Sequence, residues 1–184
     1  MLDRVKLREQ VADANIKALT SIKQEELDAL VTAIIEANRI FVAGWGRAGN
    51  MIKILSMNCS QIGLKTFVVG DNSTPSIHEG DLFVIGSGKG TTATMLEMAK
   101  QCKAHGAKLA LVTSVADSPI GDLADLKVVI PRAVPLDSWQ DAPSAVVLSY
   151  YQTTIMVVDV IMAYVMDELG KTFKDVQFYH NNLE

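Results

Sequence analysis

The sequence predicts an α/β protein, a three-layer α-β-α sandwich built around a five-stranded parallel sheet. Three observations lead to this prediction. Short, wholly apolar runs alternate with helical patterns, as expected for parallel strands that are covered on both faces. Loops rich in glycine or in hydroxyl side chains follow several of these runs. The chain has 184 residues, 49% of them hydrophobic, which is enough for one domain over residues 1–184 with a substantial core.

The central part of the chain, at about 39–130, carries the strands and their crossover helices. Strands are predicted at 39–43, 66–69, 82–85, 109–112 and 128–130. Helices are predicted between them at about 50–62 and 92–105, followed by a short helix at 119–124. Ser118 stands where the N-cap of the short helix is expected, with Pro119 in its first turn.

Helices are also expected on both sides of this central part. In the N-terminal segment, about 1–38, apolar residues recur at helical spacing, and Ser21 with Gln24 three residues later resembles a capping box. After a loop with three prolines at 131–143, a long helix is predicted at about 144–169. The tail, about 172–184, is predicted to form a last short helix that begins at a second capping box.

The composition narrows the possible partners. A formal net charge of −4 argues against a nucleic-acid partner, but it allows a phosphate ligand, because backbone N–H groups bind phosphate without a basic surface. Cys59 and Cys102 lack the spacing of a metal site or a disulfide framework. We therefore expect two buried free thiols in a reducing compartment, and no metal.

The long apolar helix bears on location and assembly. Residues 1–10 are charged and contain no secretion signal, and the stretch 146–166 carries Asp159 near its centre, which is unfavourable in lipid. We expect a cytoplasmic protein without membrane contact, whose long helix is buried in protein. Because this helix is apolar on nearly all sides, we expect a homo-oligomer, a dimer or a tetramer.

The first of four loops at the carboxyl ends of the strands is Gly44-Trp45-Gly46-Arg47-Ala48-Gly49. Its glycine spacing matches the dinucleotide-binding pattern, and Asp71 stands near the position of a ribose-binding acid. Such a loop suits any phosphate, so the pattern alone does not distinguish a nicotinamide cofactor from another ligand. A tight turn that lets the following helix pack close to the sheet is the alternative explanation.

The second loop has the composition of a phosphate-binding site. It contains Gly86-Ser87-Gly88-Lys89-Gly90-Thr91-Thr92. Its glycines free backbone N–H groups to turn toward one point, its hydroxyls add donors, Lys89 adds a positive charge, and a helix N-terminus follows. The order of residues is not that of a P-loop. The third loop, with Thr74, and the fourth, with Ser114, offer hydroxyls that suit either a ligand or turn formation.

Together these motifs resemble the sugar isomerase (SIS) domain family, in particular its 6-phospho-3-hexuloisomerase branch, over nearly the whole chain. Besides the first two loops, the resemblance includes Thr74-Pro75, Glu79-Gly80-Asp81-Leu82, Thr113-Ser114, Asp117-Ser118-Pro119 and the tail His180-Asn181-Asn182-Leu183-Glu184. It implies a flavodoxin-like, usually tetrameric sandwich. It also implies interconversion of 3-hexulose 6-phosphate and fructose 6-phosphate, with a phosphorylated hexose as partner and with no metal or nicotinamide cofactor.

The resemblance also implies which residues hold the sugar phosphate. Ser87, Thr92 and the backbone of Gly88 and Gly90 would hold the phosphate, with Arg47 at the sugar. Gly46, Thr74, Lys89, Thr91 and Ser114 complete the expected substrate-binding set. The family pattern has a His before the second strand and a Glu early in the long helix, where this chain has Gln61 and Tyr151-Gln152.

Moving a carbonyl along a sugar requires a base that lifts a proton from carbon and an acid that polarises the carbonyl. We expect His180 to be the base or a proton shuttle, because a tail can reach a neighbouring subunit. Glu79 is the candidate to replace the missing carboxylate. His78 lies in the loop after Thr74, and His105 stands at a helix end, where capping is the simpler role.

Three functions remain open from the sequence. The first is a sugar-phosphate isomerase that works through an enediol. The second is a non-catalytic sugar-phosphate sensor that has the phosphate-binding loop but lacks a base. The third is an NAD-dependent oxidoreductase that uses the first glycine loop, although the short chain leaves little room for a substrate domain.

Overall fold

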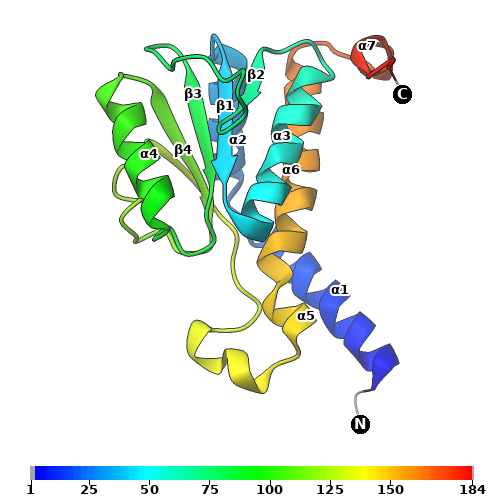
Figure 1. Cartoon of the computed structure of the whole chain (residues 1–184). Coiled ribbons are helices and arrows are strands. Elements are labelled where there is room, and N and C mark those ends of the chain that lie inside the picture. Colours follow the sequence, from blue (N-terminus) through cyan, green and yellow to red (C-terminus); the bar gives the residue numbers. More distant parts are fainter. Residues whose placement is uncertain (1–2, 184) are drawn as a thin grey trace.

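A computed structural model describes residues 3–183, apart from the side chains of Leu136, Asp137 and Trp139, and confirms the α-β-α sandwich (Figure 1). Five parallel strands form one sheet in the order β2-β1-β3-β4-β5. The strands are β1 (Ile40–Gly44), β2 (Thr66–Val68), β3 (Leu82–Gly86), β4 (Lys108–Thr113) and β5 (Leu126–Val129).

Alternate residues of each strand face opposite layers. On one face, Val42 and Val84 belong to a large core that also contains the inner sides of α2 (Gln24–Glu36), α3 (Gly46–Ser60) and α6 (Ser149–Glu168). On the other face, Phe41 and Phe83 pack with α4 (Ala93–Ala104). The central strands are therefore apolar on both faces, which explains their continuous apolar runs.

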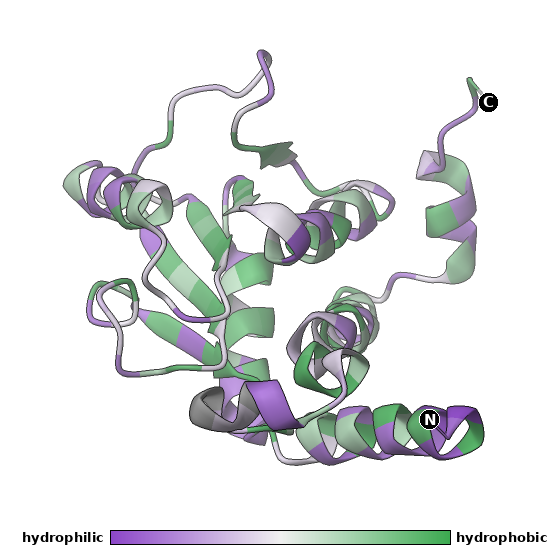
Figure 2. Ribbon diagram, turned by 60° about the horizontal axis from the view of Figure 1, so that its bottom comes forward, coloured by the Kyte–Doolittle hydropathy of each residue, from purple (hydrophilic) through white to green (hydrophobic). Residues whose placement is uncertain are grey.

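Figure 2 brings the carboxyl ends of the strands forward and shows the hydrophobic strands between the two helical layers. The chain moves from β1 to β2 on one side and from β3 to β4 on the other, so the direction of winding reverses between the adjacent strands β1 and β3. In open parallel sheets, ligands bind beyond the carboxyl ends at such a reversal. A ligand site is therefore expected at the carboxyl ends of β1 and β3.

Four helical segments add to the three layers of the sandwich. Helix α1 (Arg4–Thr20) packs on α6 and extends below the carboxyl edge, and α7 (Phe173–Tyr179) lies near the opposite end of α6 (Figure 1). The segment between β5 and α6 contains the 3₁₀ helix η1 (Leu136–Asp141) and the short α5 (Ser144–Val147). No described helix has both the length and the hydropathy that a membrane span requires.

Several predicted element boundaries were wrong. Ser21 does not cap α2: its hydroxyl donates to the Lys17 carbonyl at 2.6 Å, so it ends α1. The predicted helix at 119–124 is a series of turns, although the Ser118 hydroxyl does accept from the Gly121 amide at 3.2 Å. The long helix is divided at Leu148 into α5 and α6. The capping box of Thr172 and Asp175 is confirmed.

Candidate functional site

The loop between β3 and α4 has donors that are not used within the fold. The hydroxyls of Ser87, Thr91 and Thr92 make no hydrogen bond with any described residue, and neither do the backbone amides of Gly88, Thr91 and Thr92. Thr92 is the N-cap residue of α4, whose first amides also lack partners within the helix. These groups give the loop the chemistry of an anion-binding site.

Two amides of the same loop are already paired. The Ser87 amide donates to the Val112 carbonyl at 3.0 Å, and the Gly90 amide donates to the Ser87 carbonyl at 3.2 Å. They fix the turn and are not available to a ligand. Gly90 has a φ of +65°, and a Cβ there would collide with the Ser118 side chain, so the turn requires glycine.

The carbonyl of Gly88 is the anchor that holds this loop in place. It accepts from the Ser114 hydroxyl at 2.8 Å, from the Ser114 amide at 3.2 Å and from a guanidinium nitrogen of Arg132 at 2.7 Å. A Cβ on Gly88 would lie only 3.2 Å from the ring of Tyr150, a tight contact, and the Tyr150 hydroxyl donates to the Val112 carbonyl at 2.9 Å. Because the loop is fixed from several sides, its free donors have defined directions.

The loop between β1 and α3 lies next to the loop between β3 and α4. A Cβ on Gly49 would collide with the Gly44 carbonyl, so these two glycines allow α3 to approach the sheet closely. This agrees with the close-packing explanation of the glycine pattern. Trp45 caps the loop with a side chain that is 61% exposed, and its indole N–H donates to the Thr94 hydroxyl at 2.6 Å. Gly46, with a φ of +57°, starts α3.

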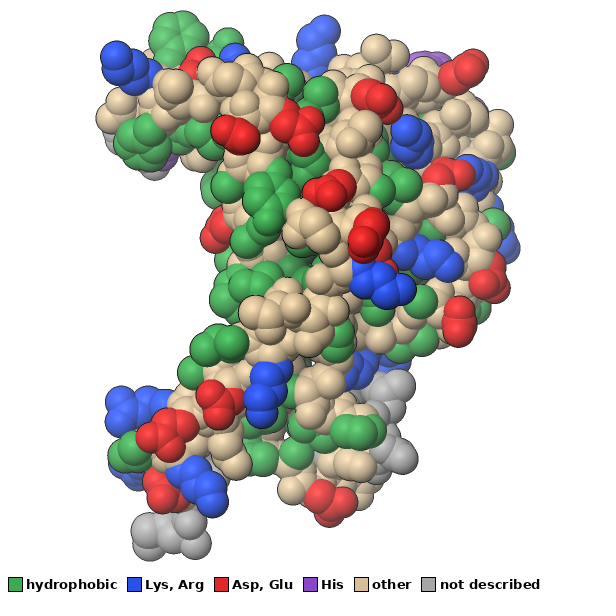
Figure 3. Space-filling model, turned by 180° about the vertical axis from the view of Figure 1, so that it is seen from behind, with side chains coloured by type: hydrophobic (Ala, Val, Ile, Leu, Met, Phe, Trp, Pro, Cys, Tyr) green, Lys and Arg blue, Asp and Glu red, His purple; other side chains and the backbone are tan. Residues whose placement is uncertain are grey.

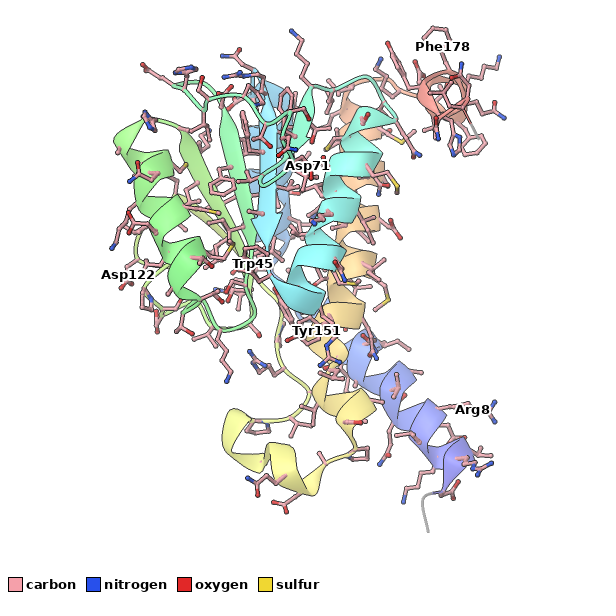
Figure 4. The ribbon with its side chains drawn as sticks, viewed as in Figure 1. Arg8, Trp45, Asp71, Asp122, Tyr151 and Phe178 are labelled. Atoms are coloured by element: carbon pink, nitrogen blue, oxygen red, sulfur yellow. The ribbon has the colours of Figure 1, made fainter. Side chains whose placement is uncertain are left out.

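Between the two loops lies a cavity of about 310 Å³ at the carboxyl ends of β1 and β3. Figure 4 shows Trp45 and Tyr151 at this end of the sheet. The lining residues are Trp45, Ala48, Gly86, Ser87, Gly88, Lys89, Thr91, Thr92, Arg132 and Tyr151. The structure therefore brings together the predicted Ser87, Gly88, Lys89, Thr91 and Thr92.

Two residues of this cavity were not in the predicted site: Arg132 was missed, and Tyr151 was noted only as standing where the family pattern has a Glu. Arg132 comes from the proline-rich segment after β5 and reaches the cavity next to Gly88. Burial lowers the pKa of its guanidinium, an effect partly opposed by the nearby hydroxyls of Tyr151 and Tyr150. Tyr151 lies in the first turn of α6, with the Arg47 guanidinium 5.3 Å from its ring centroid. No local pattern in the sequence connects Arg132 to the loops.

Seven predicted site residues are not among the lining residues of this cavity. Gly46, Arg47 and Gly90 belong to its two loops, whereas Thr74, Ser114, Glu79 and His180 have other positions. The Thr74 hydroxyl donates to the Val68 and Asp71 carbonyls at 2.8 and 2.7 Å, which holds a turn. The Ser114 hydroxyl supports the Gly88 carbonyl. Glu79 precedes β3 and packs against Gly106, which precedes β4, so it lies at the amino edge of the sheet, opposite the cavity.

His180 lies far from the cavity of its own chain. It is the C-cap residue of α7, beyond the end of α6, whereas Tyr151 is at the start of α6. A helix of 20 residues is about 30 Å long. Figure 4 shows Phe178 and Tyr151 at opposite ends of this helix. Glu184, the last residue of the matching tail, lies outside the described residues.

Two larger cavities have less suitable linings. One of about 390 Å³, lined by residues such as Phe41, Phe83 and Met98, is almost wholly apolar. Another of about 580 Å³ lies between α1 and residues 131–146, and its lining mixes charged and apolar side chains. Neither has the convergent amides and hydroxyls of the smaller cavity. Among the described residues, no three His, Cys, Asp or Glu side chains gather as a metal site.

Comparisons with known proteins point in one direction. A model of the SIS domain family matches residues 33–163. A 3-hexulose-6-phosphate isomerase of Mycobacterium gastri is 32% identical over 179 residues, covering 97% of this chain and 88% of its own length. A protein of the same name from Bacillus subtilis (strain 168) is 32% identical over 166 residues, covering 89% of each chain.

The solved structures agree with this result. A hypothetical protein from Methanococcus jannaschii, whose structure was described as inferring a molecular function of 3-hexulose-6-phosphate isomerase, matches with a TM-score of 0.82 at 26% identity. The match covers 97% of this chain and 99% of that one. Another hypothetical protein matches with a TM-score of 0.88 at 28% identity, covering 97% and 96% of the two chains.

Proposed function

We propose that this chain, which belongs to the SIS domain family, is a sugar-phosphate isomerase of carbohydrate metabolism that interconverts 3-hexulose 6-phosphate and fructose 6-phosphate. The observation that carries the proposal is the set of unused amides and hydroxyls at 87–92, which lines a cavity at the reversal of the sheet. Relatives at about 30% identity carry the name of this activity. We take residues 1–184 as one SIS domain.

The phosphate of the substrate is held by the loop after β3. Amides of Gly88, Thr91 and Thr92 and the hydroxyls of Ser87 and Thr92 donate to its oxygens, and the N-terminus of α4 adds a favourable dipole. Lys89 and Arg132 add positive charge on the lining of the same cavity. The sugar then extends along the cavity toward Trp45 and Arg47.

The base of the reaction is His180 of a second copy of the chain. Within one chain, His180 lies about one length of α6 away from Tyr151, so it reaches a cavity only across a subunit boundary. The described residues that line the cavity include no imidazole and no carboxylate, and isomerisation through an enediol needs such a group.

A concave, apolar face supports assembly into a dimer or a tetramer. Figure 3 shows a hollow between α7 and α1, with hydrophobic side chains along it. Exposed apolar residues on these elements and on the wall between them include Val5, Ile16, Met57, Tyr164 and Phe178, which is 80% exposed. An apolar patch of this kind is typical of a subunit interface. We also place the protein in the cytoplasm, because a charged phosphosugar does not cross a lipid bilayer readily.

The test is an assay of the purified protein with 3-hexulose 6-phosphate, following formation of fructose 6-phosphate. The proposal predicts saturable turnover that His180→Ala abolishes without loss of phosphosugar binding. Saturable binding with no turnover on any hexose phosphate would reject the isomerase and support the second candidate, a non-catalytic sugar-phosphate sensor. That candidate is favoured by the absence of a carboxylate or an imidazole from the described lining.

A titration with NADH tests the oxidoreductase hypothesis separately. Trp45 lies in the first glycine loop and lines the cavity, so its fluorescence would report a bound nicotinamide. Asp71 lines a different cavity from Trp45, which argues against a dinucleotide extending from one to the other. We therefore expect NADH to leave the Trp45 emission unchanged, with fructose 6-phosphate as the positive control.

A further inference from the structure

The first turn of α6 presents one phenol to the cavity. Tyr151 lines the cavity, whereas its two neighbours are engaged elsewhere. Tyr150 is buried beneath Gly88 with its hydroxyl on the Val112 carbonyl, and the Gln152 side chain accepts from the Asn15 amide at 2.8 Å. Of these three consecutive side chains, only Tyr151 is positioned to meet a ligand.

Few side chains that line this cavity can transfer a proton. Among its described lining residues, only Lys89, Arg132 and Tyr151 carry titratable side chains. An arginine remains protonated and therefore exchanges no proton. Lys89 belongs to the anion-binding loop, so its charge serves the phosphate on C6, which is three carbon–carbon bonds away from C3. Tyr151 stands on a different wall, formed by α6, where the reacting carbons of the same substrate would lie.

Two cations flank the phenol. The Arg47 guanidinium carbon lies 5.3 Å from the Tyr151 ring centroid, and the side chain of Arg132 is close enough to interact electrostatically with Tyr151. The phenol therefore stands beside two positively charged side chains, on the wall that faces the loop after β3.

We propose that Tyr151 is the acid of the isomerisation, an inference that rests on the proposed function. The base removes the proton from C2, and the bonding pair of that C–H bond forms the C2=C3 double bond. The π pair of the C3 carbonyl moves to its oxygen, which takes the proton of Tyr151. In the second half, the phenolate takes the proton of the C2 hydroxyl, the C2 carbonyl forms, and C3 takes the proton from the base. Both groups end as they began, and no oxidant or reductant is needed.

The experiment compares Tyr151→Phe with the wild type in steady-state kinetics and in binding of fructose 6-phosphate. The change removes one hydroxyl and retains the ring that contacts Arg47. We expect kcat to fall by about 10²–10⁴-fold, the range for lost general acid catalysis, with the Kd of fructose 6-phosphate changed by less than about 3-fold. Ser73→Ala, which also removes one hydroxyl, but from an exposed residue outside the cavity lining, should keep the wild-type kcat.

The two ideas fail in different ways. If the wild type has no turnover, the proposed function fails, and this inference fails with it. If the wild type is active and Tyr151→Phe retains its kcat, only the inference is overturned. A parallel loss of kcat and of fructose 6-phosphate binding, or a lowered thermal unfolding temperature of Tyr151→Phe, would also overturn it, because Tyr151 would then be a binding or packing residue.

Discussion

The two cations that line the anion-binding cavity are held differently. Arg132 is half-buried and bonded to the Gly88 carbonyl, so it both shapes the loop and carries charge. Lys89 is exposed on the loop itself. A change of Lys89 therefore tests the electrostatic contribution with less disturbance of the loop than a change of Arg132.

We predict that Lys89→Ala weakens binding of fructose 6-phosphate by about 1–3 kcal/mol, the range for a hydrogen bond to a charged group. Isothermal titration calorimetry measures the effect directly. Lys100→Ala on the exposed side of α4, where Lys100 pairs with Glu97, is the matched control and should bind as the wild type does. An unchanged affinity for Lys89→Ala would place the Lys89 ammonium away from the phosphate.

Asp81 is a buried carboxylate at the amino edge of the sheet, only 2% exposed. The Arg39 guanidinium donates to both of its oxygens, at 3.0 and 2.6 Å, and the His78 amide donates to one of them at 2.8 Å. Burial alone would raise the pKa of Asp81, but these hydrogen bonds outweigh it and hold the pKa below its ordinary value. The carboxylate thus stabilises the fold in its ionised form.

We predict that Asp81→Asn lowers the free energy of unfolding at pH 7, because it replaces a charged acceptor of the Arg39 guanidinium and the His78 amide by a neutral one. A carboxylate with a depressed pKa stabilises the fold above its unfolded pKa of about 4, and this contribution is lost as the pH falls through the folded value. The difference between variant and wild type in urea unfolding should therefore shrink toward acid pH. Asp122→Asn, at an exposed residue, should show no such trend; a pH-independent difference at Asp81 would contradict the prediction.

At the residue scale, the sequence identified the hydroxyl donors near the strand ends, but it did not show whether each one serves a ligand or the fold. Ser87, Thr91 and Thr92 could be assigned to a ligand because glycines and hydroxyls cluster in a few positions after an apolar strand. Thr74 and Ser114 have the same chemistry, yet their hydroxyls hold backbone carbonyls. Sequence does not distinguish the two uses, since the carbonyl that competes for each hydroxyl is positioned by the folded chain.

Among the elements, α3 is the one whose position depends most directly on glycine. The backbone of Gly49 lies against the Gly44 carbonyl, so a methyl group has no space between helix and strand. Trp45 and Arg47 belong to the same turn, and their positions at the cavity depend on this close approach.

We predict that Gly49→Ala destabilises the protein by about 1–3 kcal/mol, as overpacking does in tightly packed cores, and also weakens binding of fructose 6-phosphate by moving Trp45 and Arg47. Chemical denaturation and calorimetry measure the two effects. Asn50→Ala, at the exposed next position of α3, should stay within about 0.5 kcal/mol of the wild type. If Gly49→Ala keeps the stability and the affinity of the wild type, α3 can move away from β1 without cost, and the prediction is wrong.

The type of an element, helix or strand, was predictable where its apolar residues followed one clear pattern. The central strands are buried on both faces, so their apolar runs mark them clearly. The boundaries at Ser21 and near Pro119 were predicted wrongly because a cap residue and a proline suit both a helix start and a turn. The break at Leu148 carries no glycine or proline of its own, so the sequence had no signal for it.

Across the whole molecule, the sandwich and its site follow from alternation of strands and helices, but the protrusion of α1 and α7 does not. The sequences of both helices are typical of helices that pack on a core. Only the folded structure shows that some of their apolar side chains remain exposed. The two helices lie at the two ends of α6 (Figures 1 and 3). This geometry leads to the last prediction, that each active site is shared between two chains.

We predict that Tyr151→Phe and His180→Ala, each nearly inactive alone, regain activity when the two variants are co-expressed and assemble together. A site is complete when a chain with an intact Tyr151 meets a neighbour with an intact His180. With equal amounts and random assembly, about one quarter of the sites are then complete. Activity per chain, measured on purified mixed oligomers, reports this fraction.

A second mixture distinguishes a shared site from one built within a single chain. Wild type co-expressed with the double variant also gives about one quarter of complete sites if the site is shared, but about one half if both groups come from the same chain. In the latter case the mixture of single variants stays inactive. Because Tyr151 is at the start of α6 and His180 lies beyond its end, we expect about one quarter of the sites to be complete in both mixtures. No activity from the two single variants, together with one half from wild type and double variant, would assign both residues to the same chain.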